Sequence, residues 1–320
     1  MKFLICGVGS IGERHIRNLI SMGYDDIILY RKRSLALRSI NRTFPLFKNL
    51  NEALDQKPDV AFICNPTHLH METALQCARG NCNLFIEKPV SNSLNAMDEL
   101  ISILSKNKKI AMVGYMMRYH PSVLQIKEWV NEQKVGETIS FRAIWAEYLP
   151  DWHPWEDYRS SYAAQKIMGG GPALTLSHEL DLALWMFGDV KKITAMSNYN
   201  SNLEIDTEHG IDILILFENG VTGNIHLDYV QKPPRRSMEI VGTKGRIEFD
   251  YYSSKLTLYS HDDSSSREFG LDDNFDRNDM FVKEIQGFID AVESYKQSPI
   301  SLEDAFMSVD IALQALNDSI

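Results

Sequence analysis

Near its start the chain reads Phe3-Leu4-Ile5-Cys6-Gly7-Val8-Gly9-Ser10-Ile11-Gly12, a strand-length apolar run followed by glycines in the pattern GxGxxG. An amphipathic segment over residues 12–22 follows directly. In such a strand–turn–helix unit the glycines allow a tight turn, a close approach of the backbone to a pyrophosphate, and close packing of helix on strand. The free N–H groups of the first helical turn favour phosphate binding. The stretch predicts a dinucleotide-binding domain, with its phosphate contacts at Gly7, Gly9, Ser10, Ile11 and Gly12.

The first 120 residues alternate short apolar runs with helical patterns, which is typical of βαβ units. We expect strands at residues 2–6, 27–30, 60–64, 84–86 and 110–113, and helices at 12–22, 69–79 and 94–106. Strands and helices at this spacing build a doubly wound parallel sheet with helices on both faces. The fold class predicted for this half is therefore a Rossmann α/β domain, residues 1–120.

After Pro121 the strand-like runs follow one another, with turn signals such as Asn219-Gly220 between them. The predicted strands are 139–145, 193–196, 211–217, 221–227, 238–241, 246–249 and 255–259, and the predicted helices are 173–187, 279–295 and 302–316. This pattern indicates an α+β domain with a largely antiparallel sheet, residues 121–320. Its expected roles are substrate binding and oligomerisation, and its final helices are candidates to pack back on the first domain.

Composition excludes several classes of protein. The 320 residues include 33 Lys plus Arg and 43 Asp plus Glu, a formal charge of −10, which argues against a nucleic-acid partner. No apolar run approaches the ~20 residues of a membrane span, and residues 3–6 are too short for a signal-peptide core. The 4 cysteines show no CxxC spacing. We expect a cytoplasmic protein with reduced thiols and no membrane partner.

The end of the second predicted strand bears on the choice of dinucleotide. A carboxylate commonly lies there, ~20 residues after the glycine turn, and binds the ribose 2′-OH of NAD. This chain instead has Tyr30-Arg31-Lys32-Arg33-Ser34. A guanidinium suits a 2′-phosphate, so Arg31, Arg33 and Ser34 favour NADP(H), with NAD(H) as the alternative. The other interpretation of this segment is a solvated basic loop.

Several further segments occur in an order that resembles the glucose–fructose oxidoreductase/inositol dehydrogenase (Gfo/Idh/MocA) family. They are Asn65-Pro66-Thr67-His68-Leu69-His70, Glu87-Lys88-Pro89, Gly114-Tyr115-Met116-Met117-Arg118-Tyr119-His120-Pro121, Gly169-Gly170-Gly171 with His178-Glu179-Leu180-Asp181, and Glu239-Ile240-Val241-Gly242-Thr243-Lys244-Gly245. Together they span the chain. The resemblance implies a cofactor-binding first domain and a substrate-binding second domain.

The family's acid/base lysine matches Lys88, which follows an apolar run at the carboxyl edge of the predicted parallel sheet, where ligands bind. Partial desolvation there lowers a lysine pKa toward a range useful for proton transfer. A strand-end Lys88 paired with Glu87 and pointing to water is the plainer alternative. The resemblance also implies cofactor contacts, which we assign to Asn65, Pro66, Thr67, His70, Glu87, Lys88 and Arg118. For His70 a packing or supporting role, and for Arg118 an ion pair at a domain interface, are the alternatives.

His178 matches a family histidine that follows the glycine triplet. His178 and Asp181 lie three apart on a predicted helix and share a face, and imidazole is the usual acid/base group near neutral pH. We therefore assign catalytic roles to Lys88, His178 and Asp181. Many family members carry Asp four residues before this histidine, where this chain has Leu174. Asp181 is a candidate to orient His178 instead, or His178 serves mainly in substrate binding.

The stretch 147–162 concentrates aromatic, acidic and hydrogen-bonding side chains, which suit a polyhydroxylated ring. An aromatic loop at a subunit interface is the alternative. The predicted substrate-binding residues are Tyr148, Trp152, His153, Arg159, Tyr162, Thr175 and Arg235.

These residues predict an NAD(P)-dependent oxidoreductase that transfers a hydride between nicotinamide and a secondary alcohol or ketone carbon of a sugar, cyclitol or nucleotide-activated sugar. The alternatives are a reductase of a non-sugar carbonyl or biliverdin-like compound, and a non-catalytic cofactor-binding regulator. No metal is expected, since His68 and His70 lack the i, i+4 spacing of a helical metal pair. The resemblance alone implies a homodimer or homotetramer. We further expect the side chains of Lys88 and His178, one from each domain, to meet at the nicotinamide.

Overall fold

The computed structural model describes residues 1–32, 37–261, 266–272 and 274–319, which form two compact units. Unit 1 comprises Met1–Tyr115 and Arg277–Phe306, and unit 2 comprises Met116–Asp276 and Met307–Ile320. The chain thus leaves unit 1 near residue 115, close to the division expected at residue 120, and returns to it at residue 277. Unit 1 therefore includes a helix from late in the sequence, Arg277–Ser294, in addition to the helices of its first 115 residues.

Unit 1 is built on a parallel sheet of six strands in the order β3-β2-β1-β4-β5-β6 within the described residues. The strands are β1 (Phe3–Cys6), β2 (Ile27–Tyr30), β3 (Leu46–Phe47), β4 (Val60–Ile63), β5 (Asn83–Glu87) and β6 (Ala111–Gly114). The order reverses beside β1, so the carboxyl ends of β1 and β4 flank the topological switch point where ligands bind in doubly wound sheets. The predicted Rossmann class is confirmed.

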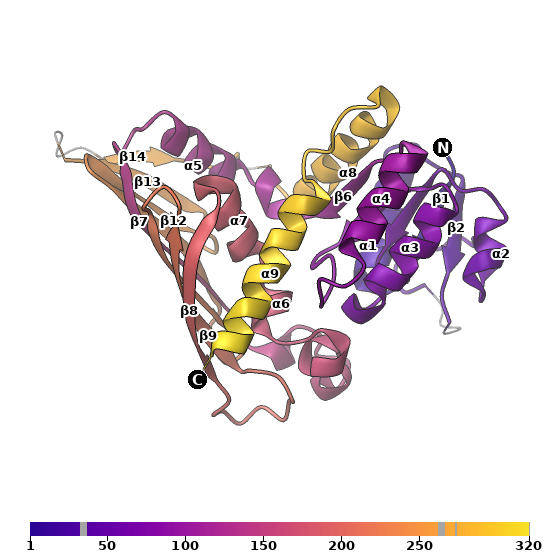
Figure 1. Cartoon of the computed structure of the whole chain (residues 1–320), viewed down its shortest axis with the longest axis horizontal. Coiled ribbons are helices and arrows are strands. Elements are labelled where there is room, and N and C mark those ends of the chain that lie inside the picture. The colour runs from indigo at the N-terminus through magenta and orange to yellow at the C-terminus, as the bar shows by residue number, and fades with distance from the viewer. Residues whose placement is uncertain (33–36, 262–265, 273, 320) are drawn as a thin grey trace. The chain divides into compact units, whose positions relative to one another are not determined.

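Helices cover both faces of this sheet (Figure 1). They are α1 (Ser10–Ser21), α2 (Leu50–Leu54), α3 (His70–Arg79), α4 (Met97–Asn107) and α8 (Arg277–Ser294), with a 3₁₀ turn at Thr67–Leu69 before α3. One face packs His15 of α1 and Phe288 of α8 against Phe62 and Phe85. On the other face α3 brings Cys77 beside Cys6 of β1, with their sulfur atoms 4.0 Å apart. Both thiols are reduced and buried, as are Cys64 and Cys82.

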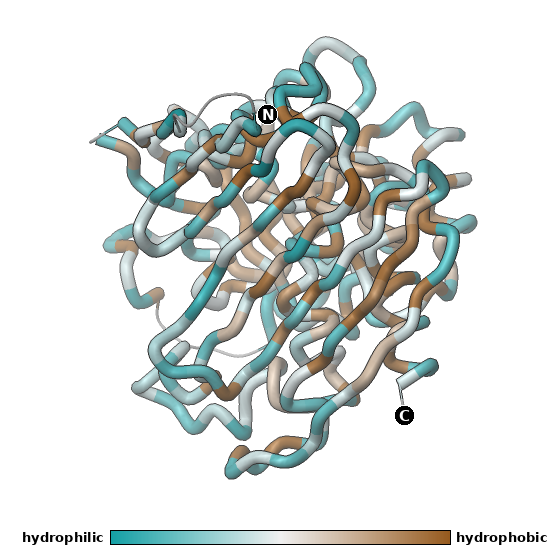
Figure 2. The backbone as a smooth tube through the Cα atoms, turned by 90° about the vertical axis from the view of Figure 1, so that its left-hand side faces the viewer, coloured by the Kyte–Doolittle hydropathy of each residue, from teal (hydrophilic) through white to brown (hydrophobic). Residues whose placement is uncertain are grey.

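Unit 2 contains an eight-stranded sheet in the order β14-β13-β12-β11-β7-β10-β9-β8 among the described residues. The strands are β7 (Thr138–Ala146), β8 (Val190–Asn198), β9 (Gly210–Phe217), β10 (Thr222–Asp228), β11 (Arg235–Gly242), β12 (Gly245–Asp250), β13 (Lys255–Ser260) and β14 (Ser266–Phe269). Neighbouring strands are antiparallel except for the central β7–β10 pair. The predicted largely antiparallel sheet is confirmed. Apolar and polar residues alternate along its strands, which Figure 2 shows as alternating colours.

The helices of unit 2 pack on one face of that sheet. They are α5 (Pro121–Asn131), α6 (Pro172–Thr175) and α7 (His178–Phe187), with residues 307–318 of α9 (Leu302–Asp318), and 3₁₀ turns at Met116–Tyr119, Leu149–Asp151, Tyr158–Ser160, Tyr162–Ala164 and Lys166–Met168. Phe187 of α7 stacks on Phe141 of β7, with ring centroids 4.8 Å apart. The single helix expected over residues 173–187 is wrong, because the chain breaks between α6 and α7 at Leu176-Ser177.

In the described part of the chain no helix is both long and apolar enough to cross a membrane.

Candidate functional site

The glycine turn of unit 1 has the geometry of a phosphate cradle. Gly7 has φ +94°, and a Cβ placed on it would lie 2.5 Å from the backbone nitrogen of Asn65. A Cβ on Gly12 would lie 2.2 Å from the Gly7 carbonyl oxygen, so both positions require glycine. A Cβ on Gly9, by contrast, would meet nothing within 4 Å. Helix α1 starts at Ser10 without a side-chain cap, which leaves its first N–H groups to bind a ligand. The turn fits a pyrophosphate.

Arg31 follows β2 at the same edge of the sheet. Its backbone N–H donates to the Phe47 carbonyl at 3.2 Å, and its Nε is buried with no partner among the described residues. Lys48 Nζ donates to the Lys32 carbonyl at 3.1 Å, which adds two more cationic residues nearby. Arg33 and Ser34, also predicted to bind the cofactor, lie outside the described residues.

The loop after β4 closes the other side of the glycine turn. Asn65 donates from Nδ2 to Thr73 Oγ1 at 2.7 Å, while its Oδ1 is buried and has no partner in the described chain. Pro66 precedes a 3₁₀ turn that begins at the buried Thr67. His70 lies behind this loop, with Nε2 2.7 Å from the Asn65 carbonyl and Nδ1 2.9 Å from the Pro89 carbonyl. His70 therefore ties the loop after β4 to the loop after β5, and burial lowers its pKa.

Lys88 lies at the carboxyl end of β5, between two residues that histidines hold in place. Glu87 Oε1 lies 2.6 Å from Nε2 of the buried His15, and Glu87 Oε2 accepts the Lys88 backbone N–H at 3.3 Å. On the other side, His70 holds the Pro89 carbonyl. Since both neighbours of Lys88 are anchored, its backbone has little freedom. The Glu87 carboxylate pairs with the buried His15.

In unit 2, His178 begins α7 and is buried beside Trp145 of β7, with ring centroids 5.6 Å apart. The guanidinium of Arg236 lies over the Trp145 ring, 3.9 Å from its centroid. Arg236 Nε donates to Glu179 Oε1 at 2.7 Å, and both side chains are buried. Burial raises the pKa of Glu179 to about 7, although the Arg236 charge opposes the shift.

Asp181, one turn after His178, forms an ion pair with Arg118. Arg118 donates from Nε and Nη2 to the two carboxylate oxygens of Asp181, at 3.0 and 2.7 Å. The Arg118 guanidinium also lies 5.5 Å from the ring centroid of Trp185 on α7. The pair fixes α7 to the 3₁₀ turn that carries Arg118. Asp181 therefore orients the helix that carries His178, and Arg118 forms this ion pair within unit 2.

The glycine triplet leads into α6 through a second tight contact. A Cβ on Gly171, which has φ +95°, would lie 2.4 Å from the Glu208 carboxylate. Glu208 accepts the Ala173 N–H at 3.0 Å, and burial raises its pKa to about 7 against the effect of that bond. Thr175 Oγ1 donates to the Gly171 carbonyl at 2.7 Å and contacts the Tyr229 hydroxyl. Glu208 and Thr175 together fix the turn before His178.

The aromatic stretch 147–162 divides between this region and the exposed surface. Trp152 packs edge-on against Tyr229, with ring centroids 5.3 Å apart, and the hydroxyl of Tyr229 in turn contacts Thr175. The remaining predicted aromatic and histidine residues of the stretch are partly exposed: Tyr148, His153 and Tyr162. Tyr148 has the Lys232 ammonium 5.7 Å from its ring centroid, and His153 packs against Trp155 at 5.2 Å.

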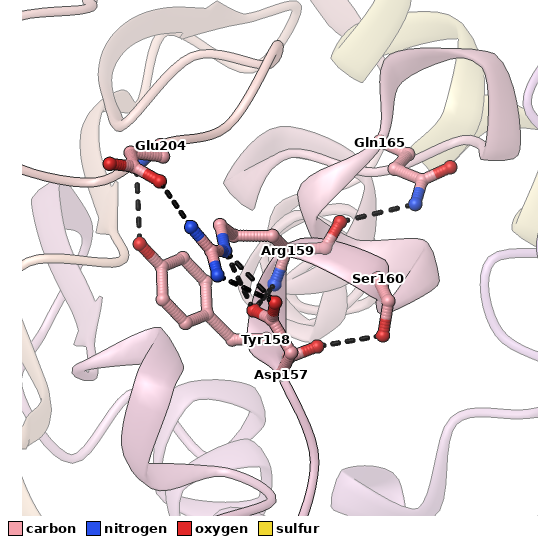
Figure 3. A network of polar contacts seen from close by, with 6 residues as sticks. All are labelled: Asp157, Tyr158, Arg159, Ser160, Gln165 and Glu204. Carbon is pink, nitrogen blue, oxygen red and sulfur yellow. Dashed lines mark hydrogen bonds and ion pairs between the residues drawn. The ribbon is translucent and has the colours of Figure 1, made fainter.

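Arg159 is exposed and bound to acidic neighbours (Figure 3). Its guanidinium forms ion pairs with Asp157 at 2.8 Å and with Glu204 at 2.5 Å. The Tyr158 hydroxyl accepts a hydrogen bond from the backbone N–H of Glu204 at 3.2 Å. The side chain therefore stabilises its own loop, and the hydrogen bond from Arg159 lowers the pKa of Asp157.

Arg235 and Arg236 point to opposite faces of β11. Arg235 is exposed and lines a groove of about 420 Å³ on the open face of the sheet, with Arg142 and Glu239. Arg236 opposes Trp145 in the β7–β11 register and is buried. The structure therefore places Arg235 on the open face of the sheet and Arg236 against Trp145, the ring that His178 packs beside. The sequence prediction assigned Arg235 rather than Arg236 to the substrate, and it missed Trp145. Glu147 Oε1 accepts hydrogen bonds from Trp145 Nε1 at 2.9 Å and from Tyr252 Oη at 2.8 Å. Strand alternation, extended back to residue 235, is the signal that finds Arg236.

No group of three or more metal-ligating side chains occurs in the described ranges.

Comparison with known proteins agrees with this geometry. The model of the oxidoreductase family with an NAD-binding Rossmann fold matches residues 1–115, and that of the GFO/IDH/MocA C-terminal domain matches residues 123–248. The chain belongs to the Gfo/Idh/MocA family of oxidoreductases. The family resemblance read from the motifs is thereby confirmed, and with it the assignment as an enzyme of the oxidoreductase class.

Relatives of this Gfo/Idh/MocA chain include two inositol dehydrogenases. Myo-inositol 2-dehydrogenase of Thermotoga maritima is 26% identical over 328 residues, covering 97% of this chain and 93% of the relative. The scyllo-inositol 2-dehydrogenase (NAD(+)) of Bacillus subtilis is 22% identical, covering 99% and 93%. Among solved structures, levoglucosan dehydrogenase in complex with NADH and levoglucosan has a TM-score of 0.86 at 20% identity, covering 100% and 98%. Myo-inositol 2-dehydrogenase from Lactobacillus plantarum has a TM-score of 0.83 at 20% identity, covering 100% and 97%. These two structural likenesses support the fold.

Proposed function

We propose that this chain transfers a hydride between NADP(H) and a secondary alcohol or ketone carbon of a sugar or cyclitol. The observation that carries the proposal is the position of Lys88, anchored on both sides at the carboxyl edge of a parallel sheet that also carries the glycine cradle. Relatives named as inositol dehydrogenases support the substrate class.

The cofactor fits residues of unit 1. The N–H groups at the start of α1 and the open space over Gly9 would hold the pyrophosphate, and Asn65 offers a buried amide oxygen without a partner in the described chain. Arg31, whose Nε is likewise without a described partner, would bind the 2′-phosphate, which supports NADP(H) over NAD(H). The bound nicotinamide supplies or accepts the hydride.

Lys88 is proposed as the group that exchanges the hydroxyl proton. An ammonium group can donate a proton to a developing alkoxide, and a neutral amine can take one from an alcohol. The anchored backbone lowers the entropic cost of holding that group in a productive position. His178 is proposed as a second acid/base or substrate-binding group, and Asp181 as a positioning residue that acts through Arg118.

The substrate wall of unit 2 is proposed to include Trp145, Thr175 and Trp152. Aromatic faces beside hydroxyl and charged groups match the alternating C–H and O–H surface of a sugar ring. Trp152 Nε1 is buried with no partner among the described residues and is available to donate to a substrate oxygen.

The test is a panel of inositols, hexoses and nucleotide-activated sugars, offered with NADP⁺ and separately with NAD⁺ while the absorbance of the reduced nicotinamide is followed. We expect turnover on at least one cyclic polyol and a higher kcat/KM with NADP⁺. Turnover confined to non-sugar carbonyls would contradict the substrate class, and cofactor binding without turnover on any member would contradict catalysis.

We also propose that the chain forms a homo-oligomer. The open face of the unit 2 sheet supports this, because it exposes apolar side chains at Ile139, Met196 and Leu214. Sedimentation of the purified chain tests this proposal, and a monomer at micromolar concentration would contradict it.

A further inference from the structure

A cluster of three titratable side chains lies inside unit 1, behind the strand end that carries Lys88. His15 and Glu284 are 0% exposed, and Glu87 is 8% exposed. They come from three elements, α1, α8 and β5, which are far apart in the sequence. None of the three belongs to the glycine cradle or to the substrate wall.

The packing of α8 places Glu284 over the ends of β4 and β5. Phe281, Glu284 and Phe288 are spaced by three and four residues, so they share one helix face. Phe281 lies 6.4 Å from His15 between ring centroids. Phe288 lies 5.6 Å from Phe85. Glu284 therefore sits between two aromatic rings and faces the sheet.

The strands place the other members of the cluster on the same side. Glu87 is two residues beyond Phe85 on β5, so both side chains leave the same face of the sheet. Cys64 stands in the same relation to Phe62 on β4. The charges of Glu87 and Glu284 both raise the pKa of the Cys64 thiol, after the larger effect of burial. Cys64, Glu87 and Glu284 thus share one interior space.

The hydrogen bonds of this space are incomplete. Glu87 Oε1 is 2.6 Å from His15 Nε2. In contrast, His15 Nδ1 and both carboxylate oxygens of Glu284 are buried with no protein partner in the described chain. A buried carboxylate that accepts no hydrogen bond and faces a second carboxylate is strongly unfavourable, whereas a neutral carboxylic acid is tolerated.

We propose that Glu284 is a built-in proton site of unit 1, a neutral carboxylic acid that internal water connects to the His15–Glu87 pair. A buried water needs two to four polar partners, and the open sites on His15 and Glu284 supply them. Glu87 then keeps the negative charge that binds His15, and Glu284 keeps the proton. The site stabilises the strand end before Lys88 only while Glu284 is protonated. This proposal does not depend on the proposed reaction.

The consequence is a dependence of stability on pH with a definite sign. Burial first, and the Glu87 charge second, raise the pKa of Glu284 well above its ordinary value. The folded chain therefore binds more protons than the unfolded chain at every pH between the two pKa values of this group. Stability consequently falls as pH rises from about 4.3, the unfolded value, toward the raised folded value. Among the described residues, the titratable groups beside Glu284 are Glu87 on β5 and Cys64 after β4, and His15 on α1 is bound to Glu87.

The test compares Tm of the wild-type chain with that of Glu284→Gln between pH 5 and pH 8.5. Gln has nearly the same shape and stays neutral, so its Tm should rise relative to wild type with pH, by at least about 3 °C over the range. Glu293→Gln, an exposed change on the same helix, is the matched control and should shift by the same amount at every pH. Parallel wild-type and Glu284→Gln curves would overturn the proposal.

Infrared spectroscopy gives a second readout that needs no activity. At pH 8.5 the carboxyls of Glu179 and Glu208, with pKa values of about 7, are largely ionised. A remaining carbonyl band of a protonated carboxyl in the wild-type chain, lost in Glu284→Gln, supports the site. If the Gln variant does not fold, the wild-type spectrum decides alone: presence of the band supports the proposal, and its absence refutes it.

Discussion

Asp181 holds Arg118 through two hydrogen bonds in the interior of unit 2, and the two side chains are 0% and 6% exposed. Replacing Asp181 by Ala leaves the guanidinium buried without this carboxylate. We therefore expect the free energy of unfolding to fall by about 3–5 kcal/mol, the usual cost of breaking a buried pair from one side. Urea denaturation followed by tryptophan fluorescence measures this loss.

The control for this prediction is the double variant Arg118→Leu/Asp181→Leu. Because it removes both charges, it should recover much of the stability lost by the single variant. If the loss of unfolding free energy in the double variant equals the sum of the losses in Arg118→Leu and Asp181→Leu, the two side chains act independently.

The features predicted well from the sequence are those with a local cause. The apolar run before Gly7 ends where β1 ends, and the run before Lys88 ends one residue before the end of β5, because strands buried on both faces consist mostly of apolar side chains. For the same reason the positions of the glycine turn and of Lys88 at the sheet edge follow from the sequence alone.

The features that the prediction missed depend on distant contacts. The break at Leu176-Ser177 gives no signal in the sequence, because neither glycine nor proline lies between Ala173 and Phe187. The orientation of Arg236 depends on β11 starting at residue 235, three residues before the predicted start. The final helices are candidates to pack back on the first domain, and α8 lies in unit 1, but the approach of Glu284 to Glu87 depends on packing that no local pattern encodes.

Arg31 is expected to set the preference for the phosphorylated cofactor. Arg31→Ala removes a charge-assisted contact worth about 1.5–3 kcal/mol, so Kd for NADPH should rise roughly 10- to 100-fold while Kd for NADH stays nearly constant. Quenching of intrinsic fluorescence on titration gives both constants. Lys106→Ala, an exposed cation on α4, serves as the matched control. Equal weakening of NADH and NADPH would remove Arg31 from 2′-phosphate recognition.

Lys88→Met is expected to separate chemistry from cofactor binding. Met keeps the length of the side chain but carries no proton, so kcat should fall about 10²- to 10⁴-fold. Kd for NADPH should change little, because the glycine cradle is untouched. The exposed Lys106→Met controls for loss of a cation. A variant that keeps wild-type kcat would exclude Lys88 as the acid/base group.

Glu208 is expected to make stability depend on pH in unit 2. Its folded pKa of about 7 lies above the unfolded value, so the folded chain binds the extra proton and stability is lost as pH rises from about 4.3 through 7. Glu208→Gln removes this loss. From pH 5 to pH 8 the unfolding free energy of the variant should rise relative to wild type by up to about 3 kcal/mol. Urea denaturation at each pH measures it, with the exposed Glu218→Gln as control. A difference that is constant with pH would contradict the assignment.

Gly9→Ala is expected to distinguish a ligand cradle from a purely structural turn. The added methyl group meets no protein atom within 4 Å, and Gly9 already has an ordinary φ of −92°. The free energy of unfolding should therefore change by less than about 1 kcal/mol, the typical cost of Ala at a helix N-cap. A methyl group in that space would nevertheless keep a pyrophosphate from approaching the first N–H groups of α1, so Kd for NADPH should rise at least about 10-fold. Gly12→Ala, whose methyl group would lie 2.2 Å from the Gly7 carbonyl oxygen, should instead lose stability and binding together. Unchanged NADPH affinity in Gly9→Ala would mean that the phosphates bind elsewhere.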